Sequence, residues 1–184
     1  MFSVKKITTA SICLALCYVL PMAFHAVGLG STFLPMHIPV LLCGLLCPWP
    51  YGLFCGIAGP ILSSLLSSMP PAVRLIYMVP ELAVYGLVTA LLFRRIRTGN
   101  TVLDVYASLI PAMLLGRVIG GIVQAVFFLS TAQEFTLALW AGAYLVEGLP
   151  GIAVQLVLLP LLVLALTRAG LIPRKYAPKA VASK

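Results

Sequence analysis

The chain has 184 residues, of which 62% are hydrophobic and only 9% charged, and its mean hydropathy is +1.13. Soluble globular domains of ordinary composition are far less apolar, so the composition excludes that class and predicts an integral membrane protein. At about 20 residues per helical span, the length accommodates roughly five to seven spans in a single membrane domain.

The net charge of +8 comes almost entirely from basic residues in three segments, residues 5–6, 94–97 and 168–184. Lys and Arg near the ends of spans favour the cytoplasmic side, so all three segments are predicted to be cytoplasmic and the number of spans even. The charge therefore indicates topology and contact with the lipid bilayer, and it does not indicate a nucleic-acid partner.

Apolar runs and helix-breaking residues predict six helices, at about 7–22, 38–47, 52–66, 71–94, 102–130 and 136–166, followed by a basic tail at 168–184. Pro39 suits the first turn of the second helix, where a missing N–H is harmless. Gly52, Gly56 and Gly59 give the third helix a smooth face for close packing. The predicted fold class is an all-α membrane bundle of six transmembrane helices with both termini in the cytoplasm.

Five cysteines lie in apolar runs, where cysteine behaves as a small hydrophobic residue. Neither histidine stands at zinc-ligand spacing from them, so no metal or redox site is predicted. No catalytic residue or cofactor is expected either.

The fourth predicted helix carries two ionisable residues, Arg74 and Glu81, inside its apolar run. A charge in a membrane-spanning helix costs roughly 2.5 to 3.5 kcal/mol on insertion scales, so it normally faces a partner or a watery cavity. Their spacing of about two helical turns places both on one face, with Tyr77 and Tyr85 one turn to either side of Glu81. Pro80 predicts a kink that opens a pocket beside the carboxylate.

The next two predicted helices repeat this pattern of polar residues on one face. Arg117 and Gln124 share a face of the fifth helix, and a face of the sixth carries aromatic, acidic and amide side chains. Because buried unpaired charges cost several kcal/mol, we expect these groups to surround one outward-opening cavity. The alternative is that interhelical salt bridges only hold the bundle together. The candidate substrate-binding residues are His37, Arg74, Tyr77, Glu81, Tyr85, Arg117, Gln124, Trp140, Tyr144, Glu147 and Gln155.

The segments FLPMHIPVLLCGLLCPWPYG, MPP and PELAVYGLVTALL, on a chain of this length, resemble the substrate-binding S component of an energy-coupling factor (ECF) transporter. The resemblance spans about Ser11 to Leu166. It implies six helices, a substrate site near the outer surface built from helices four to six and the first loop, and docking through the first helix. Ser11 to Ala15 stands where the family has its AxxxA docking motif, with serine in the first position.

The resemblance also implies partners in a prokaryotic plasma membrane: a transmembrane scaffold (T) subunit and two ATP-binding cassette ATPases. ATP would be hydrolysed by those partner subunits, and the S component would topple in the membrane to release its substrate inside. The sequence agrees, because it contains no G-x-x-x-x-G-K-[ST] phosphate loop.

Two other functions are weighed against transport by an S component. An intramembrane enzyme could use Glu81 and Glu147 as acid and base, but the sequence has no H-E-x-x-H or G-x-S-x-G motif. A self-sufficient channel or exchanger needs polar residues through the whole membrane depth, and residues 86–93 and 156–166 offer few.

The expected substrate is a small water-soluble vitamin bearing a carboxylate. Two arginines suit an acid, while the glutamates and glutamines offer acceptors and donors for hydroxyl and amide groups. Pantothenate is the first prediction, followed by niacin and a form of vitamin B6, because the aromatic side chains suit a flat ring equally well.

Overall fold

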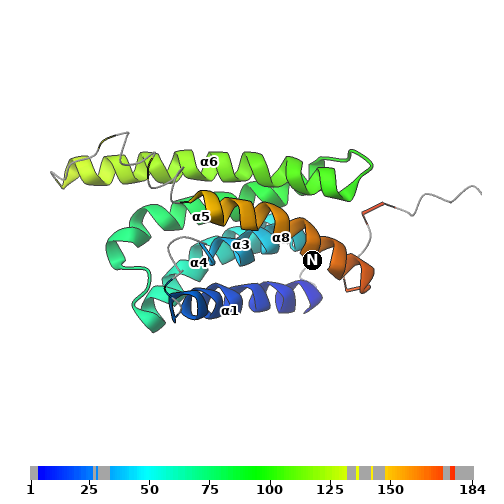
Figure 1. The fold of residues 1–184 in the computed structure, drawn as a ribbon, viewed down its shortest axis with the longest axis horizontal. Coiled ribbons are helices and arrows are strands. Elements are labelled where there is room, and N and C mark those ends of the chain that lie inside the picture. Colours follow the sequence, from blue (N-terminus) through cyan, green and yellow to red (C-terminus); the bar gives the residue numbers. More distant parts are fainter. Residues whose placement is uncertain are drawn as a thin grey trace, which may run out of the picture.

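The structure is a computed structural model that describes residues 4–26, 28, 34–131, 136, 142, 148–171 and 175–176. Within these ranges it contains helices and turns and no strand. The helices are α1 (Val4–Ala26), α3 (His37–Leu46), α4 (Trp49–Ser67), α5 (Ala72–Arg95), α6 (Thr101–Ser130) and α8 (Leu149–Arg168) (Figure 1). The prediction of an all-α bundle is confirmed.

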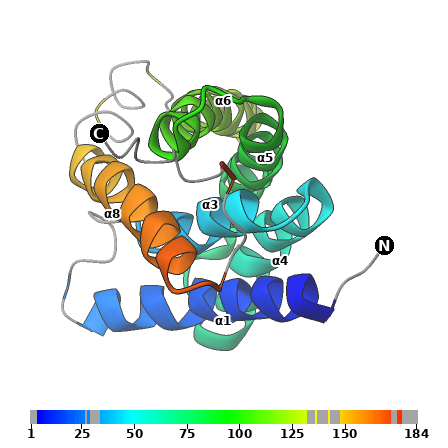
Figure 2. The same cartoon turned by 90° about the vertical axis from the view of Figure 1, so that its right-hand side faces the viewer.

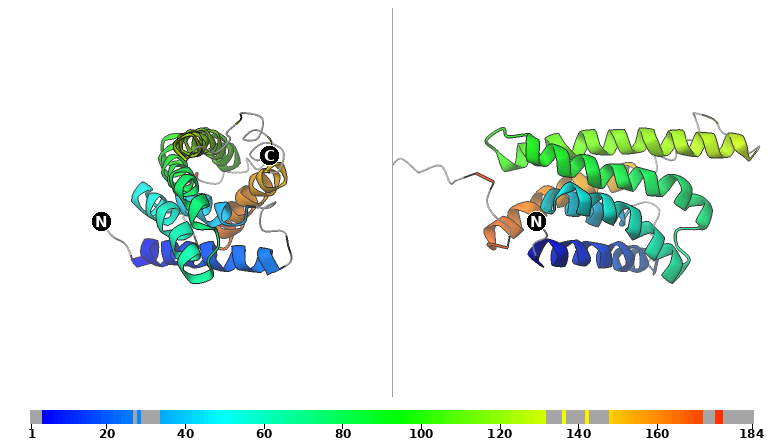
Figure 3. Two further views of the ribbon diagram at one scale, coloured as in Figure 1. Left: turned by 90° about the vertical axis from the view of Figure 1, so that its left-hand side faces the viewer. Right: turned by 180° about the vertical axis from the view of Figure 1, so that it is seen from behind.

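Helix α5 lies at the centre of the bundle, in contact with α3, α4 and α6. Helices α1 and α6 lie on opposite sides of the molecule, with α3, α4 and α5 between them (Figures 2 and 3). Helix α1 packs obliquely on α3 and α4, and α8 contacts α3 and α6 (Figure 2). Four elements therefore surround α3, the shortest helix.

Five of these helices are long and apolar enough to cross a membrane. The exception is α3, whose 10 residues extend about 15 Å, half of a hydrocarbon core about 30 Å thick. All its residues from His37 to Leu45 are buried. Helix α3 is thus a short inner helix, and its N-terminal His37 lies inside the bundle.

The end of the first helix differs most from its predicted position. Helix α1 continues past Pro21 to Ala26, because a proline removes one backbone hydrogen bond without ending a membrane helix. Of the single helix predicted at 136–166, the structure describes α8 from Leu149 on, and most of the residues before it lie outside the described ranges. Gly148 lies in a turn there, and Pro150 occupies the first helical turn, where its missing N–H is harmless.

Helices α4 and α5 pack with their backbones in contact. A Cβ atom added to Gly86 would lie 2.0 Å from the backbone oxygen of Gly52, and one added to Gly56 would lie 2.3 Å from that of Leu82. At Gly59 the nearest atom is the Cys17 Sγ of α1, at 3.0 Å. The glycine face predicted for this helix therefore packs against two neighbours.

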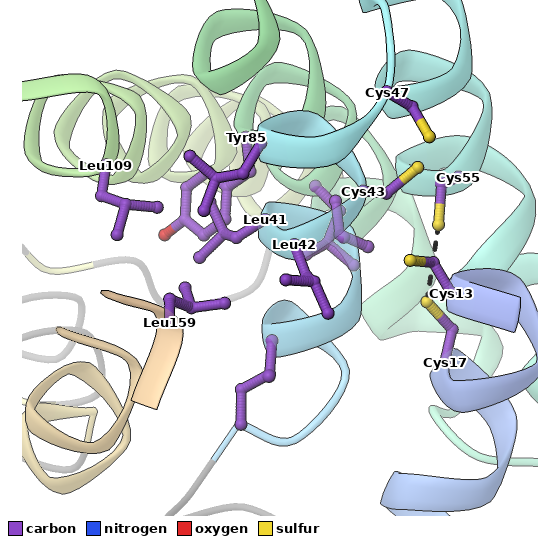
Figure 4. Packing of buried hydrophobic residues seen from close by; sticks show 14 of the residues in the cluster. Cys13, Cys17, Leu41, Leu42, Cys43, Cys47, Cys55, Tyr85, Leu109 and Leu159 are labelled. Carbon is purple, nitrogen blue, oxygen red and sulfur yellow. Dashed lines mark hydrogen bonds between the residues drawn. The ribbon is translucent and has the colours of Figure 1, made fainter. Parts of the chain in front are cut away.

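The five cysteines gather where α1, α3 and α4 meet (Figure 4). All are buried free thiols, and the Sγ atoms of Cys17 and Cys55 lie 3.8 Å apart. They act as small side chains that let these three helices approach closely.

One end of the bundle collects the basic residues and is called the basic end. The Sγ of Cys47 contacts the carbonyl of Lys6 at 3.6 Å, and the Arg94 guanidinium donates to the carbonyl of Cys47 at 2.7 Å. The start of α1 and the ends of α3 and α5 therefore meet there. Arg168 is in the last turn of α8, which ends at the same side (Figure 1). The opposite end is called the loop end.

A buried carboxylate, Asp104, closes the basic end, and sequence reasoning did not predict its partners. Asp104 is 0% exposed and accepts hydrogen bonds from the Thr98 backbone N–H at 2.8 Å and the Tyr176 hydroxyl at 2.5 Å. The Lys175 ammonium pairs with it at 2.6 Å and also donates to the carbonyl of Ile96. Burial and the hydrogen bond to Asp104 raise the pKa of Tyr176 above its ordinary value, so its phenol remains a donor.

Candidate substrate-binding site

Glu81 of α5 is the centre of a buried polar cluster. The side chain is 4% exposed, and its Oε1 accepts a hydrogen bond from the Tyr85 hydroxyl at 3.0 Å. The Nε2 of His37, from α3, lies 3.7 Å from the same oxygen, and the His37 and Tyr85 rings meet edge to face with centroids 5.4 Å apart. A short helix that begins inside the bundle thus brings an imidazole to a carboxylate far from it in sequence.

Two glycines of α6 make room for the side chains of Glu81 and Tyr85. A Cβ atom on Gly116 would lie 2.1 Å from the Tyr85 ring, and one on Gly120 would lie 3.0 Å from Oε2 of Glu81. Arg117 stands beside Gly116, is only 6% exposed, and its guanidinium acts electrostatically on Tyr85. The residues His37, Glu81, Tyr85 and Arg117 are called the polar cluster.

An apolar layer lies on the basic-end side of the polar cluster. It consists of Leu41 of α3, Leu109 of α6 and Leu159 of α8, all 0% exposed (Figure 4). Leu41 is one helical turn beyond His37, and Leu109 is two turns beyond Arg117. These three leucines are called the apolar floor; they lie nearer the basic end than His37 and Arg117 do, and the Tyr85 ring lies beside them (Figure 4).

The remaining predicted site residues have different positions. Gln155 of α8 is 0% exposed and Gln124 of α6 is half-buried. Tyr77 is half-buried in α5, whereas Arg74 is exposed in the first turn of that helix, so the structure does not bring Arg74 into the polar cluster. The predictions for Trp140, Tyr144 and Glu147 lie outside the described residues.

The predicted docking residues lie on the outer surface of α1. Ser11 and Ala15 are exposed, whereas Cys13 and Cys17 of the same helix face the core. A shallow apolar groove beside Ser11 runs between α1 and α4 and is lined by Leu14 and Phe54 among others. This surface is therefore open to a partner helix.

Sequence reasoning missed the supporting role of Gly116 and Gly120. The segment GRVIGG, residues 116–121, was interpreted only through its arginine. Small residues spaced four apart permit close helix approach in membranes. This spacing of Gly116 and Gly120 is the signal from which the space for the Glu81 side chain could have been predicted.

Comparison with known proteins decides the family. The family model for the ECF transporter, substrate-specific component, matches residues 5–163. The chain belongs to this family. None of the curated proteins and none of the solved structures matches it.

The match covers five helices and most of α8, including every residue of the polar cluster. ECF substrate-specific components are transport proteins, so this chain is a substrate-specific transport component and a multi-pass protein of the prokaryotic plasma membrane. Membership implies a small-molecule substrate and association with ECF transmembrane and ATPase modules.

Proposed function

We propose that this substrate-specific component binds a small water-soluble vitamin that carries a carboxylate, with pantothenate first and niacin next; a vitamin B6 form, which has no carboxylate, is the alternative. The observation that carries the proposal is a buried guanidinium, Arg117, at membrane depth beside a polar cluster. A buried arginine is expensive in a membrane, and its planar fork suits a carboxylate. A substrate carboxylate binds there when the site is loaded.

The apolar floor supports a role as a binding component over a self-sufficient channel. Leu41, Leu109 and Leu159 lie between the polar cluster and the basic end, and all three are fully buried. These three side chains offer no hydrogen-bond partner to a small polar solute. Release to the other side then requires movement driven by partners.

We infer that these partners are a T subunit, contacted through Ser11 and Ala15 of α1, and two ATP-binding cassette ATPases that hydrolyse ATP. No cofactor is assigned to this chain. By the concentration of Lys and Arg, the basic end faces the cytoplasm and the polar cluster lies in the outer half.

The test is to purify the chain from membranes and identify the extracted ligand by mass spectrometry. Calorimetric titrations with pantothenate, niacin and pyridoxine then compare the acids with the uncharged vitamin. Panthenol, the alcohol analogue of pantothenate, serves as the matched control without a carboxylate. The acid is expected to bind at least about tenfold more tightly than its uncharged analogue. Equal binding of both would overturn the carboxylate assignment.

A further inference from the structure

Gln155 of α8 carries a buried side-chain amide without hydrogen bonds. Its exposure is 0%, and within the described part of the chain neither Nε2 nor Oε1 has a partner. Leaving a buried donor or acceptor unbonded costs roughly 1–3 kcal/mol, and such groups in native proteins are nearly always bonded. The amide therefore needs a partner that the described residues do not supply.

Gln155 lies at the level of the polar cluster. Helices α3 and α8 both run from the loop end to the basic end, and Leu41 and Leu159 belong to one core cluster. His37 and Gln155 each stand four residues before these leucines, one turn nearer the loop end. The Nδ1 atom of His37 is also buried and without a hydrogen-bond partner among the described residues. The Gln155 amide and the Nδ1 atom of His37, from adjacent helices, thus share one level.

The chemistry of the amide selects its partner. Glutamine presents an acceptor oxygen and a donor nitrogen side by side, and both need a bond. A second carboxylate would satisfy only the nitrogen and face the oxygen with like charge. A single hydroxyl cannot make two linear hydrogen bonds to the two atoms. A donor and an acceptor on adjacent atoms satisfy both at once when they point the same way, which the N–H and C=O of an open-chain, trans secondary amide do not.

We propose, resting on the function proposed above, that Gln155 binds an edge of the substrate on which a donor and an acceptor point the same way, as found in a lactam, a cyclic urea or an α-hydroxy amide. The substrate then has two recognised ends: a carboxylate for Arg117 of α6 and an amide edge for Gln155 of α8, two helices that contact each other. Gln155 is a specificity-determining residue, because an acid without the edge leaves a buried amide unbonded.

The experiment titrates purified wild-type protein and Gln155→Leu with three probes. Pantothenate carries a carboxylate and an α-hydroxy amide edge, and biotin carries a carboxylate and a cyclic-urea edge, whereas niacin carries the carboxylate alone. Wild type is expected to bind at least one edge-bearing acid about tenfold or more tightly than niacin, and Gln155→Leu to abolish that preference. The variant should also melt at a higher temperature without ligand, because the unbonded amide is gone.

Thr89→Val is the matched control. Thr89 is 0% exposed, its hydroxyl likewise lacks a hydrogen-bond partner among the described residues, and it packs against Gly44 near the basic end of α3. This variant removes an unbonded buried group elsewhere and should bind every probe as wild type does.

The outcomes separate the two proposals. If niacin binds wild type as tightly as the edge-bearing acids, and Gln155→Leu binds all three unchanged, the amide edge is overturned while a carboxylate-binding component remains. If none of the three acids binds, the proposed function itself fails. A Gln155→Leu protein with a lower melting temperature and unchanged preference would show that the amide is bonded without the substrate and overturn the inference.

Discussion

At the scale of single residues, burial distinguishes the two membrane arginines. Arg117 is 6% exposed and stands beside Glu81 and Tyr85, whereas Arg74 is exposed in the first turn of α5. Both arginines share a helix face with another polar residue, so the sequence pattern alone does not distinguish the buried arginine from the exposed one. Depth within the packed bundle does so, since only a desolvated guanidinium gains strongly from an anionic ligand.

Arg117→Ala is expected to weaken binding of the copurified ligand by roughly 100-fold, because a charge-assisted hydrogen bond in a buried site is lost. Arg74→Ala, its matched control, should change affinity little. Titration calorimetry measures both, and size-exclusion profiles in detergent report folding. If Arg117→Ala aggregates, and binding is lost only in proportion to the unfolded protein, the alternative is favoured in which Arg117 forms a salt bridge that only holds helices together.

At the scale of helices, the sequence predicts the positions of several helices but not the contacts between them. The hydrophobic pattern and the helix-breaking residues predict the bounds of α3, α4 and α5 to within a few residues, because proline and glycine act on the local backbone. The convergence of His37 on Glu81 was not predictable, because it depends on a short helix starting inside the bundle.

Gly86→Ala is expected to destabilise the protein by about 1–3 kcal/mol, and more if α4 and α5 cannot separate, because its Cβ would overlap the Gly52 backbone. Gly59→Ala should be milder, since its nearest neighbour is the movable Cys17 thiol. Thermal unfolding in detergent compares the two variants. A Gly86→Ala protein as stable as wild type would mean that these helices do not pack with backbones in contact.

Ser11→Trp and Ala15→Trp test the outer face of α1. Both residues are exposed, so a bulky side chain leaves the bundle intact but prevents close approach of a partner helix. We expect binding to purified protein to be unchanged and uptake by cells to be lost. Leu114→Trp, at a position of α6 that is 62% exposed, is the lipid-facing control and should retain both. Loss of binding and uptake in parallel would place this face inside the fold.

At the scale of the whole molecule, an ion pair and hydrogen bonds connect chain segments at the basic end, and the polar cluster lies in the middle of the bundle. Residues after α8 return to the turn between α5 and α6, where Lys175 and Tyr176 meet Asp104. An ionic closure at one end, an apolar floor and a polar cluster beyond it form three successive layers. In this order the polar cluster is the layer nearest the loop end.

The closure at the basic end yields the last prediction. Asp104 is fully buried and the Lys175 side chain is 16% exposed, so removing one partner leaves the other poorly solvated. Asp104→Asn and Lys175→Met are each expected to lower the unfolding temperature in detergent. Together they should lower it by less than the sum, with a coupling of about 1–3 kcal/mol. Arg95→Met, an exposed position at the same end, is the control and should have little effect. Strict additivity of the two changes would show that the tail rests beside the bundle without bonding to it, and the basic end would then be closed by α5 and α6 alone.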